Sequence, residues 1–323
     1  MNYVFNPFAP VPVNWKSHVR GWAMHWAECL GARIALKDTD LSQASTLYWD
    51  HGVNFGGSLN LFGGVSEEIV RRIEQLVAHK GELVSLDVPM PNYAEQLRKR
   101  LGQSTCHYSL TSELLGQFEA RLAASKTLTQ ANLGRALVTI GDSHSTAFAA
   151  RGCAILRTNG QTLYGALKDS KILQQLDSLD VAPRHVTLVY GSIDIRHHIG
   201  RQYTPMSAIE GMCKNYAQVV NHIKGEYLCD VEVAAPVPVE HEGRKLPQTG
   251  CYKGAAFYGS REKRLEWTLH FIDQMRSYGV DVVTPPMRWY EMDGEEYAST
   301  FMEMGGSVHI APMFYRRFDW GTL

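Results

Sequence analysis

Apolar and polar residues alternate along this chain with two different periods. Apolar side chains recur at helical spacing over residues 206–223 and 260–278, which predicts two amphipathic helices. Short runs rich in β-branched and aliphatic residues, at 137–140, 229–233 and 280–283, predict strands. Because strands and helices alternate, we expect an α/β fold whose mainly parallel sheet carries helices on both faces.

The first half of the chain repeats this alternation on a smaller scale. Ser66 precedes a run in which Ile73, Leu76 and Val77 share one face, so we expect a capped amphipathic helix there. The runs at 45–49 and 83–88 predict short strands. This half therefore also has an α/β pattern.

The length of the chain indicates more than one domain. A chain of 323 residues exceeds one average domain. We expect a smaller α/β domain, accessory or ligand-binding, over residues 1–130 and a larger one over residues 131–323. The polar stretch 125–132 is the candidate linker, although its composition also allows a helix.

A candidate nucleophile directly follows the strand predicted at 137–140. The residues Gly141-Asp142-Ser143 come next, and the helix-compatible stretch 146–150 comes after them. A strand, a tight turn and a helix start would place the Ser143 hydroxyl at the carboxyl edge of a sheet, near backbone N–H groups that stabilise negative charge. The alternative is an ordinary helix cap, because Asp and Ser are preferred capping residues.

Four short motifs give the second half a family resemblance. Gly141-Asp142-Ser143, Asn159-Gly160-Gln161-Thr162, the run from Leu188 to Asp194, and Ser307-Val308-His309 occur in that order. In this order and spacing, residues 133–323 resemble the SGNH (GDSL-type) hydrolase superfamily. The resemblance implies flavodoxin-like layering around a parallel sheet. The N-terminal region matches no family that we can name.

The resemblance also implies a role for each motif. Ser143 would be the nucleophile, His309 the general base, and the Gly160 N–H part of an oxyanion hole. Asp142 is expected to shape the turn that presents Ser143.

Two positions depart from the family pattern. Ile193 stands where the third motif has an asparagine, and Gly306 stands where the last motif has the aspartate that orients the histidine. A backbone carbonyl could orient His309 instead; Glu303 is the nearest acidic residue before it.

The third motif offers a replacement for the missing amide. The run from Gly191 to Arg196 resembles a divergent branch that reads Gly-x-Ile-Asp-x-Arg and is associated with glycan and surface-polymer metabolism. Arg196 would then bind the oxyanion or a substrate carboxylate through its planar guanidinium. The alternative is that Asp194 and Arg196 form a buried pair that braces the loop.

A glycine-rich segment in the first half is a possible ligand loop. It spans residues 50–64 and contains the polar residues Asp50, His51, Asn54 and Asn60. Such a loop can approach a ligand closely, and it follows a predicted strand, where open α/β sheets bind ligands. A long turn that merely needs its glycines is the alternative.

Composition limits the choice of partners. With 32 basic and 33 acidic residues, net charge does not indicate a nucleic-acid partner, although a local basic groove is compatible with it. No apolar run reaches the ~20 residues that cross a bilayer, so we expect no membrane association. The six scattered cysteines indicate reduced thiols and a cytoplasmic protein. We expect neither a metal nor a cofactor.

These features predict serine-dependent acyl-ester chemistry. The enzyme would be a specialised esterase, deacylase or acyltransferase, acting on a small-molecule or polymer-linked acyl substrate such as a glycan or a nucleotide-linked group. The alternative is a non-catalytic protein that uses the same scaffold to recognise a polymer or a partner.

Overall fold

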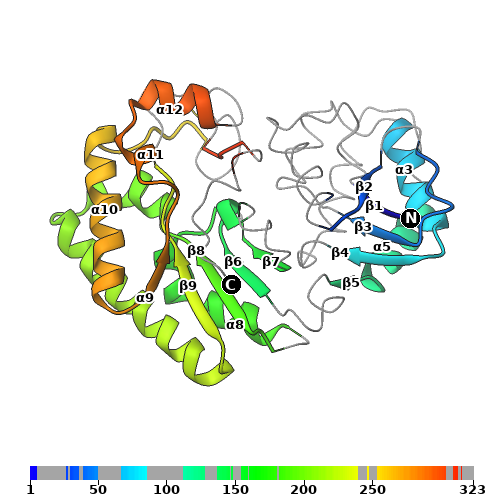
Figure 1. Cartoon of the computed structure of the whole chain (residues 1–323), viewed down its shortest axis with the longest axis horizontal. Coiled ribbons are helices and arrows are strands. Elements are labelled where there is room, and N and C mark those ends of the chain that lie inside the picture. Colours follow the sequence, from blue (N-terminus) through cyan, green and yellow to red (C-terminus); the bar gives the residue numbers. More distant parts are fainter. Residues whose placement is uncertain are drawn as a thin grey trace. The chain divides into compact units, whose positions relative to one another are not determined.

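The computed structural model divides the chain into two compact units. The first comprises residues 1–133 and 150–154, and the second comprises residues 134–149 and 155–323. The parts that the structure describes are residues 1–5, 27, 30–35, 39–49, 67–85, 112–127, 137–145, 147, 154–158, 160–179, 182–238, 246, 253–302, 308–311 and 314. Each unit is built around its own parallel sheet (Figure 1).

The first unit has five strands in the order β2-β1-β3-β4-β5. All of its strand pairs are parallel. Its elements are β1 (Asn2–Phe5), β2 (Arg33–Ile34), β3 (Thr46–Trp49), α3 (Glu67–Ala78), β4 (Glu82–Ser85), α5 (Ser112–Ala123) and β5 (Lys126–Thr127).

The core of the first unit lies between this sheet and its two described helices. Ile73 and Leu76 of α3 are fully buried, as their helical spacing predicts. Trp49 at the end of β3 meets Phe118 of α5 edge to face, with ring centroids 6.2 Å apart. Because these side chains come from strand and helix alike, the apolar stripe of each element is covered by the other.

The second unit has five strands in the order β10-β9-β8-β6-β7. The pairs β6–β8, β8–β9 and β9–β10 are parallel. The strands are β6 (Leu137–Gly141), β7 (Ala154–Arg157), β8 (His185–Val189), β9 (Asp230–Ala234) and β10 (Asp281–Val283). The helices are α7 (Leu163–Lys168), α8 (Lys171–Asp177), α9 (Pro205–Tyr227), α10 (Arg261–Ser277), α11 (Arg288–Glu291) and α12 (Gly294–Phe301). A π-helical turn, η2 (Asp194–His198), and a 3₁₀ turn, η3 (Ile199–Arg201), follow β8.

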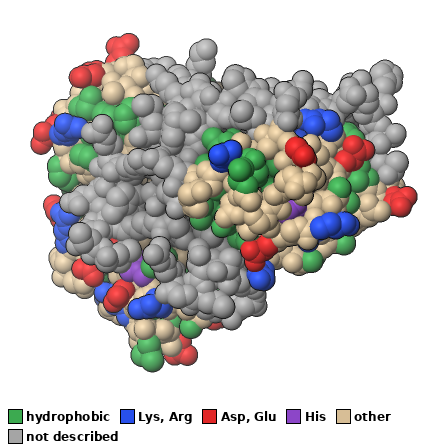
Figure 2. Space-filling view, turned by 45° about the vertical axis from the view of Figure 1, so that its right-hand side comes forward, with side chains coloured by type: hydrophobic (Ala, Val, Ile, Leu, Met, Phe, Trp, Pro, Cys, Tyr) green, Lys and Arg blue, Asp and Glu red, His purple; other side chains and the backbone are tan. Residues whose placement is uncertain are grey.

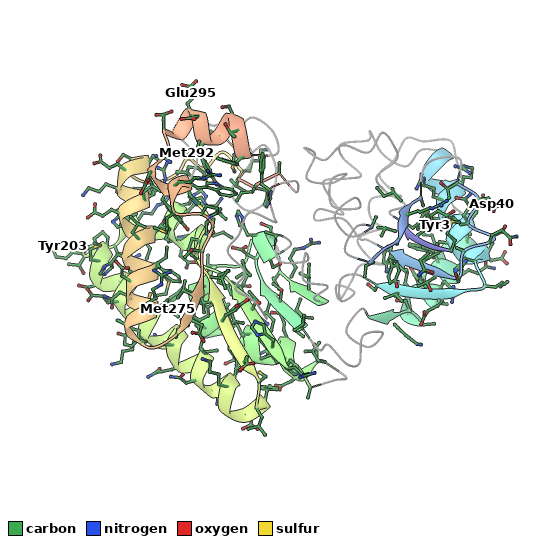
Figure 3. All side chains as sticks on the ribbon, viewed as in Figure 1. Tyr3, Asp40, Tyr203, Met275, Met292 and Glu295 are labelled. Carbon is green, nitrogen blue, oxygen red and sulfur yellow. The ribbon has the colours of Figure 1, made fainter. Side chains whose placement is uncertain are left out.

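The long helices of the second unit pack beside one another along the sheet. The chain moves in one direction across the sheet from β7 to β8, β9 and β10, so right-handed crossovers place α8, α9 and α10 on the same face. Helix α9 contacts both α7 and α10. Met275 of α10 is fully buried, whereas Tyr203 before α9 projects into solvent (Figure 3). The connection that crosses the other way, from β6 to β7, lies largely outside the described residues.

The predicted α/β class and parallel sheet are confirmed. Helix α10 and strands β9 and β10 lie within one residue of the expected bounds, and α9 extends four residues further at its C-terminal end. The linker expected at 125–132 is wrong in part, because residues 126–127 form β5, which pairs with Val84 and Ser85 of β4. A polar edge strand of two residues is too short to show a period of its own.

One glycine allows the central strands of the second unit to meet. A Cβ on Gly141, the last residue of β6, would lie 2.3 Å from the carbonyl oxygen of Val189 and 2.8 Å from the Val189 Cβ. Since real Cβ atoms do not approach a backbone oxygen so closely, β6 and β8 can keep this spacing only with glycine at position 141.

We predict that Gly141→Ala lowers the free energy of unfolding by about 3 kcal/mol, because the added methyl forces β6 and β8 apart. The matched control is Gly211→Ala in α9, where a Cβ would meet nothing within 4 Å. That change should be neutral or stabilise by about 0.5–1 kcal/mol. Urea unfolding of both variants measures the difference, and equal stability of Gly141→Ala and the wild type would contradict the argument.

Candidate active site

Ser143 is presented by a tight turn at the end of β6. The Asp142 N–H donates to the Val189 carbonyl at 3.0 Å, and the Ser145 N–H returns to the Asp142 carbonyl at 3.1 Å. The Asp142 carboxylate also accepts the His144 N–H at 2.8 Å. These bonds leave Ser143 partly exposed between buried neighbours, as a nucleophile requires.

His309 contacts Ser143 directly. Its Nε2 lies 2.9 Å from the Ser143 Oγ, although 166 positions separate the two residues in the sequence. This distance is within hydrogen-bond reach, so the imidazole can accept the hydroxyl proton. The sequence predicted such an approach, and the structure brings these two residues together.

Backbone pairing and an aromatic cluster place His309. Its neighbour Ile310 forms an antiparallel bridge with Met302, and the Ala311 N–H donates to the Phe301 carbonyl at 2.7 Å. Phe301 stacks on Trp289 with ring centroids 4.3 Å apart. The segment that carries His309 is therefore tied to α11 and α12.

Gly160 lies on the same edge of the sheet as Ser143. The Thr158 N–H, just after β7, donates to the Gly141 carbonyl at 2.9 Å, which aligns the ends of β7 and β6. Gly160 follows Thr158 by two residues, and Ser143 follows Gly141 by two residues. The φ of Gly160 is +75°, a value that favours glycine at this turn.

Asp194, at the start of η2, is buried and makes hydrogen bonds to another segment of the chain. It is 2% exposed, and its two oxygens accept the N–H groups of Leu163 and Tyr164 at 2.7 and 3.1 Å. These N–H groups belong to the first turn of α7, where a carboxylate stabilises the helix. Asp194 thereby ties η2 to the segment that contains Gly160.

Arg196 is buried behind the Ser143 turn. Its Nε donates to the Ser192 carbonyl at 2.9 Å, and its Nη2 lies 2.7 Å from the His144 Nε2. The guanidinium also lies 5.8 Å from the centre of the Phe257 ring. With 4% of its surface exposed, Arg196 is placed against His144, and a contact between Arg196 and substrate stays a prediction.

Asp142 carries an unusual carboxyl group. Burial raises its pKa to about 6, although the His144 N–H and the nearby charges of Arg196 and His309 favour the ionised form. Its Oδ2 is buried and has no hydrogen-bond partner among the residues that the structure describes. The group is therefore costly to ionise, and its Oδ1 shapes the turn as expected.

Several residues predicted for the site lie outside the described parts of the chain. They include the ligand-loop residues Asp50, His51, Asn54 and Asn60, and also Glu303 and Gly306 near His309. In the described parts, no group of three or more His, Cys, Asp or Glu side chains is arranged to hold a metal ion.

The sequence analysis gives His144 no role, although it directly follows the first motif. Its ring centroid is 5.0 Å from that of His309, and it also contacts Arg196. The only local signal was its position next to Ser143. Its contact with Arg196 spans 52 positions and could not be read from spacing.

Comparisons with known proteins find similarity at the level of solved structures. No protein-family model matches the chain, and no curated protein matches it. A GDSL-like lipase from Bacteroides thetaiotaomicron is 15% identical, with a TM-score of 0.37, over 56% of this chain and 83% of its own. A carbohydrate acetylesterase from Sinorhizobium meliloti is 18% identical, with a TM-score of 0.37, over 57% and 94%. A lipase/acylhydrolase from Enterococcus faecalis is 14% identical, with a TM-score of 0.35, over 56% and 90%. Each of these similarities covers little more than half of this chain.

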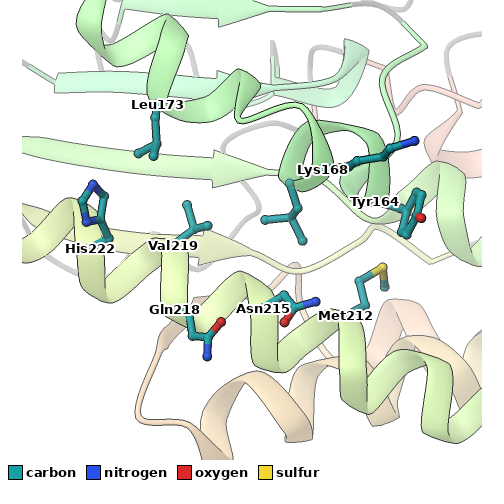
Figure 4. Close-up of a pocket in the computed structure, with 9 residues that line it drawn as sticks. Tyr164, Lys168, Leu173, Met212, Asn215, Gln218, Val219 and His222 are labelled. Carbon is teal, nitrogen blue, oxygen red and sulfur yellow. The ribbon is translucent and has the colours of Figure 1, made fainter.

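A separate groove lies between α7, α8 and α9 (Figure 4). Its volume is about 430 Å³, and its lining includes Tyr164, Lys168, Met212 and His222 but neither Ser143 nor His309. The groove could hold more than a water molecule, but the described residues that line it include no nucleophile paired with a base. The candidate chemistry therefore belongs to the contact between Ser143 and His309.

On the face in Figure 2, the described surface is neither mainly acidic nor mainly basic. Acidic and basic side chains are interspersed there. Within the parts that the structure describes, no helix has the length and apolar composition needed to cross a membrane.

We predict that Asp142→Asn gains stability relative to the wild type as pH rises from about 4 to 7. The folded state holds the Asp142 proton up to a pKa of about 6, whereas the unfolded chain loses it near 3.8, so the wild type loses stability across this interval. Asparagine keeps an oxygen for the His144 N–H and cannot ionise. The relative gain between pH 4 and pH 7 should be about 2 kcal/mol, because part of the wild-type loss has already occurred at pH 4; urea unfolding at both pH values measures it. An identical stability difference at pH 4 and pH 7 would refute the shifted pKa.

Proposed function

We propose that this protein is a serine esterase in which Ser143 is the nucleophile and His309 is the general base. The observation that carries the proposal is the distance of 2.9 Å between the Ser143 Oγ and the His309 Nε2. A serine hydroxyl is a weak nucleophile until a base within hydrogen-bond reach accepts its proton. The partial exposure of both residues leaves room for a substrate carbonyl.

The reaction follows from this pair. As the Ser143 Oγ bonds to the carbonyl carbon of an ester, its proton passes to the His309 Nε2. When the tetrahedral intermediate collapses, the bond to the leaving oxygen breaks and His309 returns the proton to the departing alcohol. Water, activated by the same histidine, then attacks the acyl-serine and releases the acid and the free enzyme.

Backbone N–H groups are the proposed oxyanion donors. The N–H groups of Ser143 and Gly160 lie on one edge of the sheet, since the ends of β6 and β7 are aligned by the Thr158–Gly141 hydrogen bond of 2.9 Å. Ile193 is an apolar side chain that cannot donate, so the backbone must supply more of the stabilisation. Asp194 supports this role by holding the first turn of α7, directly after Gly160.

For the substrate we propose an acyl group on a polar carrier, such as a glycan or a nucleotide-linked group. This choice rests on the resemblance of the Gly191–Arg196 run to the divergent branch with glycan-related roles. Transfer of the acyl group to a hydroxyl or an amine is the alternative second step, because an acyl-serine can be attacked by either acceptor or by water. A cytoplasmic location also stays a prediction.

A fluorophosphonate probe tests the proposal. Such a probe phosphonylates an activated serine by losing fluoride, with the serine proton taken up by the base. We expect stoichiometric labelling of the wild type, complete loss in Ser143→Ala, and at least a ~100-fold slower rate in His309→Ala, in line with the contribution of a general base. Intact-mass spectrometry over time measures all three.

Two matched variants control for the loss of a serine or a histidine as such. Ser178→Ala at the end of α8 and His222→Ala, at an exposed position of α9, should label at the wild-type rate. Folded wild-type protein that stays unlabelled, or labelling that survives in Ser143→Ala, would overturn the esterase proposal. The first result would favour the non-catalytic scaffold.

A further inference from the structure

Contacts with Asp142, Arg196 and His309 place His144. Its backbone N–H donates to the Asp142 carboxylate at 2.8 Å, its side-chain Nε2 lies 2.7 Å from the Arg196 Nη2, and its ring lies 5.0 Å from that of His309 at an angle of 49°. It is 6% exposed. Because it is buried and its Nε2 contacts Arg196, the His144 ring is held in one orientation, and it lies beside the His309 ring.

The contact with Arg196 defines the protonation state of His144. A guanidinium has only donors and stays charged at all relevant pH values. At 2.7 Å the shared proton therefore belongs to Arg196, and the His144 Nε2 must supply a lone pair. His144 is then neutral and carries its proton on Nδ1.

Arg196 is itself anchored and does not depend on His144 for its position. Its Nε donates to the Ser192 carbonyl, its backbone carbonyl accepts the Tyr258 N–H at 2.8 Å, and its guanidinium lies against the Phe257 ring. The π-helical turn η2, which carries Arg196, begins after the four residues that follow the end of β8. The anchor thus originates at the strand that pairs with β6.

We propose that Arg196 and His144 are positioning residues for His309, with Arg196 fixing the tautomer and orientation of the His144 ring and that ring holding the His309 imidazole beside Ser143. The inference rests on the proposed esterase function. It explains how His309 can be oriented although position 306 is a glycine, where the resembling family has an aspartate that orients the histidine.

The neutral state of His144 is essential to this arrangement. During the reaction His309 becomes a cation, and a second imidazolium at 5.0 Å would repel it. By occupying the His144 lone pair, Arg196 prevents that second protonation. Among the described residues, the charged groups that act on the two rings include Arg196, which contacts His144, and Asp142, which interacts electrostatically with His309, Arg196 and Asp194.

The pH dependence of kcat/KM tests the pair. In the wild type we expect one proton to inhibit on the acid side, so the slope of log kcat/KM against pH should be about 1. In Arg196→Met, His144 is free to bind a proton near the ordinary histidine pKa of about 6.5, and the slope should rise toward 2. We also expect kcat to fall at least ~10-fold with little change in KM, since the ground-state contacts are kept.

Two further variants separate positioning from a general loss of packing. Arg196→Lys keeps a charged donor and should restore the slope of about 1 with partial recovery of kcat. The double variant Arg196→Met with His144→Phe removes the second titrating ring and should also return to a slope of 1. The matched control is His185→Phe, which removes a buried histidine 3.2 Å from Glu232 on the sheet and should lower stability without changing the pH profile.

A direct measurement does not depend on the variants or on catalysis. Long-range ¹H–¹⁵N NMR of wild-type protein labelled with ¹⁵N-histidine should show His144 with a proton on Nδ1 and none on Nε2 across pH 5–8. A His144 proton on Nε2, or titration of His144 in this range, would overturn the proposal even if Ser143 labels normally. An Arg196→Met variant with an unchanged slope and kcat would overturn it as well. Failure of the esterase function itself would appear instead as the absence of Ser143 labelling.

Discussion

The parallel pairing of β6 with β8 is the interaction on which the candidate site depends. Gly141 faces Val189 in register, and there is no room for a Cβ between them. Ser143 follows the first strand by two residues, and the turn that carries Arg196 follows the second. Because both strands run the same way, their carboxyl ends bring the nucleophile and its supporting residues to one edge of the sheet.

The two units share one strand order, and this explains where their chemistry is expected. In each sheet the first strand in the chain lies between the second and the third, so the connection after the first strand and the connection after the third run in opposite directions. Open α/β sheets bind ligands at such a switch point. In the second unit it lies between β6 and β8, next to Ser143. In the first unit it lies between β1 and β3, and the glycine-rich segment follows β3 directly; its ligand stays a prediction.

The sequence predicted the parts of this protein that leave a local signal. Long helices such as α9 show their period over many turns, and the pair Ser143 and His309 could be named from short motifs near a strand end and near the C-terminus. The edge strand β5 was missed because it has two residues. The contact between Arg196 and His144 could not be predicted either, since it depends on how η2 packs against the turn after β6. Asp194 shows the same limit, because its partners Leu163 and Tyr164 come from a different segment.

The central claim is that Ser143, activated by His309, forms an acyl-enzyme. Rapid mixing with p-nitrophenyl acetate, followed by acid quenching and peptide mass spectrometry, tests it most directly. We expect a burst of p-nitrophenol that approaches one equivalent per chain, with the acetyl group on Ser143. Turnover with no acetyl on Ser143, or an acetyl group that accumulates on another side chain, would contradict it.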